Sequence, residues 1–214
     1  MAFNDLINGA LTSTGQVRNE PVQARSSERI GALLDAASAV VAEVGIERLT
    51  TAMVAERAGA SIGTVYRYFP DRIAVLSAMS LRGFERFLRL GVENLERVQP
   101  TTVAGVLDSL IDASIQLHRT EPGYTSIRLS DQIALPDVED GTAAARVATP
   151  LAAILVDQLG VDEDGLAARL DIALTIADAL LVRAFLGAPE GDEAAIGAAR
   201  GVVAGYLAGS TVSA

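Results

Sequence analysis

The sequence predicts an all-α protein. Apolar residues recur at helical spacing along most of the 214 residues, and no run of alternating β-branched residues indicates a strand. Glycine, proline and acidic residues interrupt this pattern at intervals, as turns between helices do. A composition of 50% hydrophobic and 21% charged residues is sufficient for one or two domains with a core of their own.

The first long helix is expected over residues 26–44, where a stripe of apolar residues ends at Gly45. Residues 1–24 are rich in Asn, Ser, Thr, Gly and Gln without a clear period, and are expected to form a disordered arm. Arg18 and Arg25 could reach a minor groove or phosphates from such an arm. A solvated tail without a role is an equally good interpretation.

Two short helices are predicted within residues 50–70, which have the sequence TTAMVAERAGASIGTVYRYFP. The hydroxyls of Thr50 and Thr51 can cap a helix over residues 52–58, and Gly59 can end it. Ser61 can cap a second helix, which must stop before Pro70. Two short helices joined by about three residues form a helix-turn-helix, whose second helix enters the major groove of DNA in many proteins.

The second helix of this pair is expected to have two different faces. Ile62, Val65 and Phe69 recur at positions i, i+3 and i+7 and are predicted to face inward. The outward face offers hydroxyls, an arginine and a glycine that lets the backbone come close to a nucleic acid. A surface hairpin without a function would have little reason to expose two tyrosines. The outward set consists of Gly63, Thr64, Tyr66, Arg67 and Tyr68.

Residues 50–72 resemble the signature of the tetracycline-repressor (TetR) family of bacterial transcription regulators. The family pattern has a Thr-Thr start, a V-A-x-x-A-G turn and an S-x-G-x-x-Y-x-Y-F helix, and the match extends over residues 29–81. The resemblance implies an all-helical homodimer that binds a double-stranded DNA operator and is released by a small effector. It implies a three-helix DNA-binding domain over residues 25–70 and a ligand-binding and dimerisation domain over residues 71–214.

The resemblance also implies a set of DNA-binding residues. Thr51 corresponds to a phosphate contact at the start of the second helix. Arg72 falls where the family commonly has a phosphate-binding lysine, and this chain contains no lysine. The full expected set is Thr51, Ser61, Gly63, Thr64, Tyr66, Arg67, Tyr68 and Arg72.

Beyond Pro70, Asp71 can cap a long helix that runs to about residue 98 and physically joins the two predicted domains. Loops rich in glycine, proline and acidic residues then separate the remaining helices. These are expected over residues 102–118, 124–133, 142–159, 163–186 and 192–207.

The C-terminal domain is expected to hold a mainly apolar effector, because Ala, Val, Leu and Ile dominate residues 101–186. Asp178 could hold a cationic ligand, or pair with Arg169 or Arg183. His118 is favoured near a helix C-terminus even without a ligand. A regulator without an effector and, remotely, a helical carrier or enzyme are the alternative functions. The candidate ligand-binding residues are Leu110, Ser114, His118, Tyr124, Ile127 and Asp178.

Four glycines, ending at Gly209, are spaced by four along the final helix. Each interior glycine costs about 1 kcal/mol relative to alanine, so the stripe is expected to face a closely packed helix. A frayed, glycine-rich tail is the alternative. The predicted dimer interface contains Gly197, Gly201, Gly205, Val202 and Tyr206.

Composition excludes several classes of function. Without cysteine and with one histidine, the chain offers no disulfide, no usual zinc site and no Ser-His-Asp triad, so we expect no cofactor, metal or catalytic residue. No secretory signal and no long uncharged apolar stretch occur, which predicts a cytoplasmic location away from membranes.

The net charge of −10 is unevenly distributed along the sequence. Residues 18–90 contain ten arginines and eight acidic residues, whereas residues 91–214 contain seven arginines and eighteen acidic residues.

Overall fold

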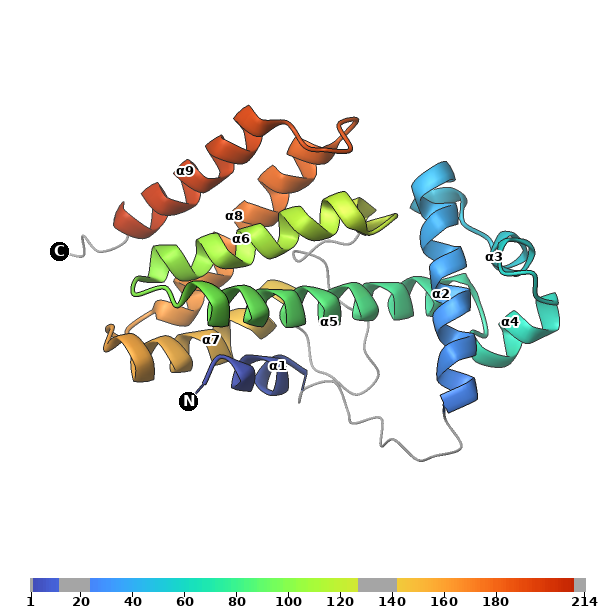
Figure 1. The fold of residues 1–214 in the computed structure, drawn as a ribbon, viewed down its shortest axis with the longest axis horizontal. Coiled ribbons are helices and arrows are strands. Elements are labelled where there is room, and N and C mark those ends of the chain that lie inside the picture. Colours follow the sequence, from blue (N-terminus) through green and yellow to red (C-terminus); the bar gives the residue numbers. More distant parts are fainter. Residues whose placement is uncertain (1, 12–23, 127–141, 210–214) are drawn as a thin grey trace. The chain divides into compact units, whose positions relative to one another are not determined.

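The structure is a computed structural model that describes residues 2–11, 24–126 and 142–209 (Figure 1). The described residues form α-helices joined by turns and two short 3-10 helices, which confirms the predicted all-α class. The elements are α1 (Asn4–Leu11), α2 (Ala24–Val44), η3 (Ile46–Arg48), α3 (Thr51–Arg57), α4 (Ile62–Tyr68), α5 (Arg72–Val98), α6 (Val103–Thr120), η4 (Tyr124–Ser126), α7 (Ala143–Leu159), α8 (Leu166–Phe185) and α9 (Glu193–Gly209).

The chain divides into two compact units. The small unit lies within Gln16–Gly83 and Glu121–Ile127, and the large unit contains the rest. The sequence predicts a domain boundary after residue 70, but the first part of α5 belongs with the small unit. The reason is that Val75 and Met79 of α5 are buried in the core of that unit.

The small unit is built around α2, α3, α4 and the start of α5. Its caps follow the predictions, because the hydroxyls of Thr50 and Ser61 accept hydrogen bonds from the backbone N–H groups of Met53 and Thr64, each at 3.2 Å. Asp71 caps α5 in the same way. The largest part of the core consists of Leu33, Leu34, Ala37, Val40, Val41, Leu49, Val54, Ala55, Val65 and Phe69.

The segment after α6 also belongs to the small unit. The η4 turn packs against α2, and a Cβ atom on Gly123 would lie 2.9 Å from the carbonyl oxygen of Ser38. Gly123 has a φ of +74°, a conformation that glycine adopts without strain. Of the helix predicted over residues 124–133, only Tyr124–Ser126 lies within the described residues, as a 3-10 turn.

In the large unit, α7 packs on α8, α8 packs on α9, and α6 contacts both α8 and α9. Helices α5 and α6 approach closely at Gly91, where a Cβ atom would lie 2.7 Å from Leu110. Gly160 ends α7 in the left-handed conformation. Helix α8 begins at Leu166 rather than at the predicted residue 163, because Gly165 is left-handed and forms the N-cap. No helix in the described residues is long and apolar enough to cross a membrane.

The predicted disorder of residues 1–24 is wrong for the first part of the segment. Residues 4–11 form α1, which lies beside α7 in the large unit (Figure 1). Leu6 and Ala10 are completely buried, and Asn4 donates a hydrogen bond to Glu96 at 2.6 Å. Arg25 lies in α2. Residues 12–23, with Arg18, lie outside the described residues.

Candidate nucleic-acid interface and ligand-binding core

The α3–α4 pair has helix-turn-helix geometry. Helix α3 ends at Arg57 with Ala58 as its C-cap, and the next residue, Gly59, has a φ of +59°. The N–H of Ala60 donates to the carbonyl of Ala55 at 2.9 Å, which closes the turn before Ser61 starts α4. Because Val54 and Val65 are completely buried against the core of the unit, the two helices are held at a defined angle with one face of α4 outward.

The outward face of α4 is exposed at most of the predicted positions. Gly63 and Arg67 are exposed, and Tyr66 is 53% exposed. A Cβ atom on Gly63 would meet only the Ser61 hydroxyl, at 3.8 Å. The folded chain therefore does not require glycine at this position, and the absent side chain leaves room for a partner molecule to approach the backbone.

Two of the predicted orientations on α4 differ from the structure. Ile62, predicted to face inward, is 42% exposed. Tyr68, predicted to face outward, is half-buried and packs against the core. The helix is only seven residues long, and Val65 and Phe69 suffice to anchor it, so its first turn extends beyond the core. Ile62 consequently adds an apolar side chain to the outward face.

Hydroxyl groups of α3 and α4 contact one another. The Thr51 hydroxyl donates to the Tyr66 hydroxyl at 3.4 Å, and the hydroxyls of Ser61 and Thr64 lie 2.9 Å apart. Thr64 is half-buried. The first contact places the Tyr66 hydroxyl beside the N-terminus of α3, where hydroxyl groups can bind phosphate oxygens.

Arg72 has a contact within the small unit that the sequence did not indicate. Its guanidinium donates to the carbonyl oxygen of Ile46 at 2.9 Å and is partly buried. The Nε atom is buried without a hydrogen-bond partner in the described part of the chain. Arg72 thus connects α5 to η3 and leaves only part of its guanidinium for a phosphate.

The structure brings together three of the six predicted ligand-binding residues. Leu110 and Ser114 of α6 and Asp178 of α8 are buried and line one common space, with a volume of about 10 Å³. A space of this size holds at most about one water molecule. The other residues around it are Phe87, Ile111, Leu174, Ala177 and Leu181.

The other three predicted ligand-binding residues lie elsewhere. His118 stacks on Phe185, with ring centroids 4.6 Å apart, and burial lowers its pKa from 6.5 to about 4. Tyr124 is buried in the small unit. Ile127 lies outside the described residues.

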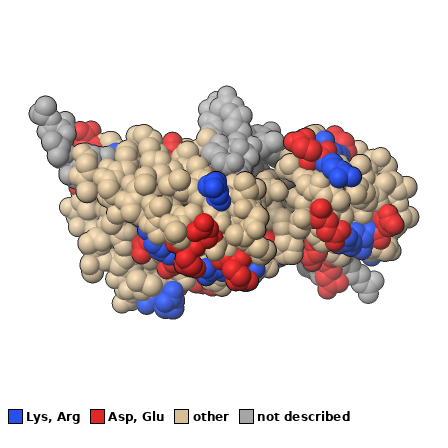
Figure 2. Space-filling view, turned by 90° about the horizontal axis from the view of Figure 1, so that it is seen from above, with Lys and Arg blue, Asp and Glu red and all other residues tan. Residues whose placement is uncertain are grey.

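The predicted dimer face of α9 is exposed. Cβ atoms on Gly197, Gly201 and Gly205 would meet nothing within 4 Å, so packing within the described chain does not require these glycines. Val202 is 49% exposed, whereas Tyr206 is half-buried. Figure 2 shows a broad area without charged side chains on the large unit.

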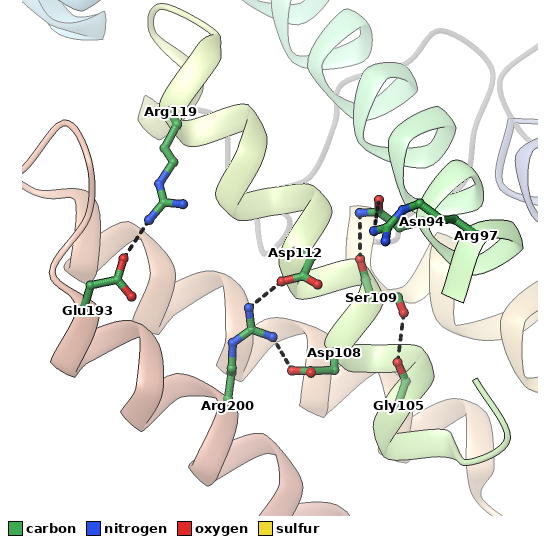
Figure 3. A network of polar contacts seen from close by, with 9 residues as sticks. All are labelled: Asn94, Arg97, Gly105, Asp108, Ser109, Asp112, Arg119, Glu193 and Arg200. Atoms are coloured by element: carbon green, nitrogen blue, oxygen red, sulfur yellow. Dashed lines mark hydrogen bonds and ion pairs between the residues drawn. The ribbon is translucent and has the colours of Figure 1, made fainter. Parts of the chain in front are cut away.

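Ion pairs hold α9 against α6 (Figure 3). Arg200 donates to Asp112 at 2.5 Å and also to Asp108, while Arg119 donates to Glu193 at 2.8 Å. Between the two helices lies an open groove of about 420 Å³, which includes Gly201 in its wall. The arrangement keeps α9 in place while its glycine face stays open to solvent.

Comparisons with known proteins agree with this architecture. Residues 33–79 match the family model described as bacterial regulatory proteins, tetR family, and residues 101–210 match the tetracyclin repressor-like, C-terminal domain. The crystal structure of a TetR-family transcriptional regulator from Streptomyces coelicolor is 32% identical, with a TM-score of 0.67. The alignment covers 84% of this chain and 98% of that chain.

Two curated relatives match over shorter segments. Nucleoid occlusion factor SlmA of Actinobacillus pleuropneumoniae is 32% identical over 106 residues, which are 50% of each chain. The HTH-type transcriptional repressor KstR of Mycolicibacterium smegmatis is 36% identical over 81 residues, 38% of each chain. The match therefore spans half or less of these relatives. Since the two family models and the S. coelicolor structure together cover most of the chain, it belongs to the TetR family of bacterial regulatory proteins.

Proposed function

We propose that the protein is a homodimeric transcriptional repressor that binds a two-fold DNA operator in the cytoplasm and is released by a small, mainly apolar effector. The observation that carries the proposal is the outward face of α4. A capped two-turn helix exposes Gly63, Tyr66 and Arg67 while Val65 and Phe69 anchor it. This face combines close backbone approach, a cation and hydroxyl groups, as a major-groove helix requires.

In this proposal, some residues of the helix-turn-helix contact bases and others contact phosphates. Arg67 and Thr64 read base edges, and Ile62 adds an apolar contact suited to a thymine methyl group. Thr51, Tyr68 and the remaining N–H groups of Arg72 bind phosphates and set the register on the duplex. The two α4 helices of a dimer enter successive major grooves roughly 34–36 Å apart.

The effector acts through the core between α5, α6 and α8. The space there is about 10 Å³, whereas small-molecule sites have volumes of roughly 300–1,000 Å³. An effector therefore binds only to a state in which these helices have moved apart. If that state has a different spacing of the two α4 helices, the effector shifts the population away from the DNA-binding state.

Binding to duplexes selected from a random pool tests the DNA interface. We expect Arg67→Ala to weaken the selected operator by roughly 1–3 kcal/mol and to relax the sequence preference at one position. Arg89→Ala removes the same charge from an exposed site in the large unit and serves as the control. The α4 assignment is wrong if Thr64→Ala, Tyr66→Ala and Arg67→Ala all leave operator affinity unchanged.

The small size of the space between α5, α6 and α8 favours one second candidate, a repressor that needs no effector. The two candidates differ in one measurement. Apolar compounds that raise the melting temperature should also lower operator affinity if the protein has an effector, because linkage is reciprocal. Compounds that bind without changing operator affinity would favour the second candidate.

A further inference from the structure

The space between α5, α6 and α8 has an unusual wall. Six of its eight residues are apolar, and the other two are Ser114, which is 5% exposed, and Asp178, which is 4% exposed. All eight belong to the large unit. Phe87 comes from α5, Leu110, Ile111 and Ser114 from α6, and Leu174, Ala177, Asp178 and Leu181 from α8.

A carboxylate at this position carries a desolvation free energy that opposes folding. Removing it from water costs several kcal/mol unless hydrogen bonds compensate, and an apolar side chain would extend the packing of its neighbours. A carboxylate has about four acceptor positions. Asp178 can therefore keep its contacts within the protein and still accept a hydrogen bond from a molecule that enters the space.

Asp171 lies about two helical turns before Asp178 on α8 and has different surroundings. It is half-exposed, and it accepts a hydrogen bond at 3.4 Å from Thr142, the N-cap residue of α7. It is not part of the wall. Both aspartates have contacts within the protein, and they differ in that only Asp178 lines the space. Asp171 is therefore a control for removing a carboxylate from the same helix without changing the wall.

We propose that the effector has an apolar body and a terminal hydrogen-bond donor, either a protonated amine or a hydroxyl, which binds the Asp178 carboxylate. The Ser114 hydroxyl offers a second hydrogen bond. A carboxylate-bearing molecule is rejected, because two carboxylates would face each other in a buried and mainly apolar site. The proposal rests on the effector core described under Proposed function and names the chemistry of its ligand.

Three eight-carbon probes of matched shape test this at pH 7: octylamine, 1-octanol and octanoate. Binding to the full-length protein is measured by calorimetry and by thermal shift. We expect octylamine and 1-octanol to bind at least about tenfold more tightly than octanoate, which is the difference that a hydrogen bond to a buried charge makes. Asp178→Asn, which nearly preserves the shape of the side chain, should reduce the preference for octylamine over octanoate to about threefold or less.

Asp171→Asn removes a charge from the same helix and should leave the preference unchanged. Three results would overturn the proposal: octanoate binding as tightly as octylamine, an unchanged preference in Asp178→Asn, or no binding of octylamine and 1-octanol. The wild-type comparison needs no variant and stands even if Asp178→Asn folds poorly. Operator binding is measured on the same preparations. If it persists while the probes fail, only the effector chemistry is wrong, whereas its absence contradicts the proposed function itself.

Discussion

Arg72 stabilises the fold in addition to its proposed contact with DNA. Its guanidinium donates to the Ile46 carbonyl, so Arg72→Ala leaves a partly buried oxygen without a charged donor. We expect the free energy of unfolding to fall by roughly 1–2 kcal/mol. Urea unfolding measures this loss, and Arg72→Lys should restore only part of it, because a lysine lacks the planar fork of the guanidinium.

The same substitution should change DNA binding in a way that does not depend on sequence. Arg72→Ala should weaken all duplexes alike and lower the slope of log K against log salt by about one unit. An unchanged salt slope would mean that Arg72 acts only within the fold.

His118 should make the stability of the protein depend on pH. Burial holds its pKa at about 4 in the folded state, against 6.5 normally, so only the unfolded chain takes up a proton between these values. Stability should therefore fall as the pH drops from about 6.5 to about 4, by at most about 3 kcal/mol. His118→Phe keeps an aromatic ring against Phe185 and should lose less stability over this range in urea unfolding. Equal losses in the two proteins would contradict the prediction.

The sequence predicts the helix caps more reliably than it predicts which side chains face the core. The caps Thr50, Ser61 and Asp71 were predictable, because a cap involves only the next three residues of the chain. Ile62 and Tyr68 were assigned to the wrong faces. The periodicity of a seven-residue helix does not show where the surrounding core ends, and that limit depends on α2 and α3.

Among the α-helices of the described residues, α1 is the one that the local sequence pattern did not predict. An isolated helix of eight residues is unstable in water, so α1 forms because α7 covers Leu6 and Ala10. The residues that determine this contact lie far apart in the sequence. The longer helices α2, α5 and α6 were predicted to within a few residues, because each carries a sustained apolar stripe.

Two glycine-to-alanine substitutions should have opposite effects on stability. In both helices, alanine improves helix propensity by about 1 kcal/mol. A Cβ atom on Gly9 would lie 2.7 Å from Cβ of Pro150, which has a rigid ring, whereas one on Gly31 of α2 would meet nothing within 4 Å. Gly9→Ala should therefore lower the melting temperature, and Gly31→Ala should leave it equal or higher. Differential scanning calorimetry of both variants measures the two melting temperatures. A Gly9→Ala variant that melts at a higher temperature than the wild type would show that α1 is not packed as described.

For the whole molecule, the exposed face of α9 predicts the oligomeric state. We infer that two α9 helices pack closely through this face, together with part of α8, where Ile172 is also exposed, and with Leu186, the exposed C-cap residue of α8. The double variant Gly201→Leu and Gly205→Leu should then produce monomers in sedimentation experiments and abolish cooperative operator binding. A double variant that remains dimeric, or a wild-type chain that is monomeric, would contradict this interface.

The uneven charge and the two-unit organisation were visible in the sequence, but the size of the effector space was not. Leu110 and Ser114 belong to an apolar stripe that the sequence shows, whereas the seven-residue spacing of Asp171 and Asp178 predicts one common face and does not show that only Asp178 lines the space. Whether the space between them is open depends on how closely α5 approaches α6 at Gly91 and on the packing of α8, which only the folded chain shows.

The docking of α1 on α7 also constrains the order in which the chain folds. During synthesis, α1 and then the helices of the small unit leave the ribosome long before α7 is available. Until then the apolar face around Leu6 and Ala10 has no partner. Contacts between distant parts of a chain form late, because the loop between them must close. Although α1 is made before α7, it should thus be among the last of the described helices to gain protection from hydrogen exchange, and its apolar face stays uncovered until α7 has been synthesised.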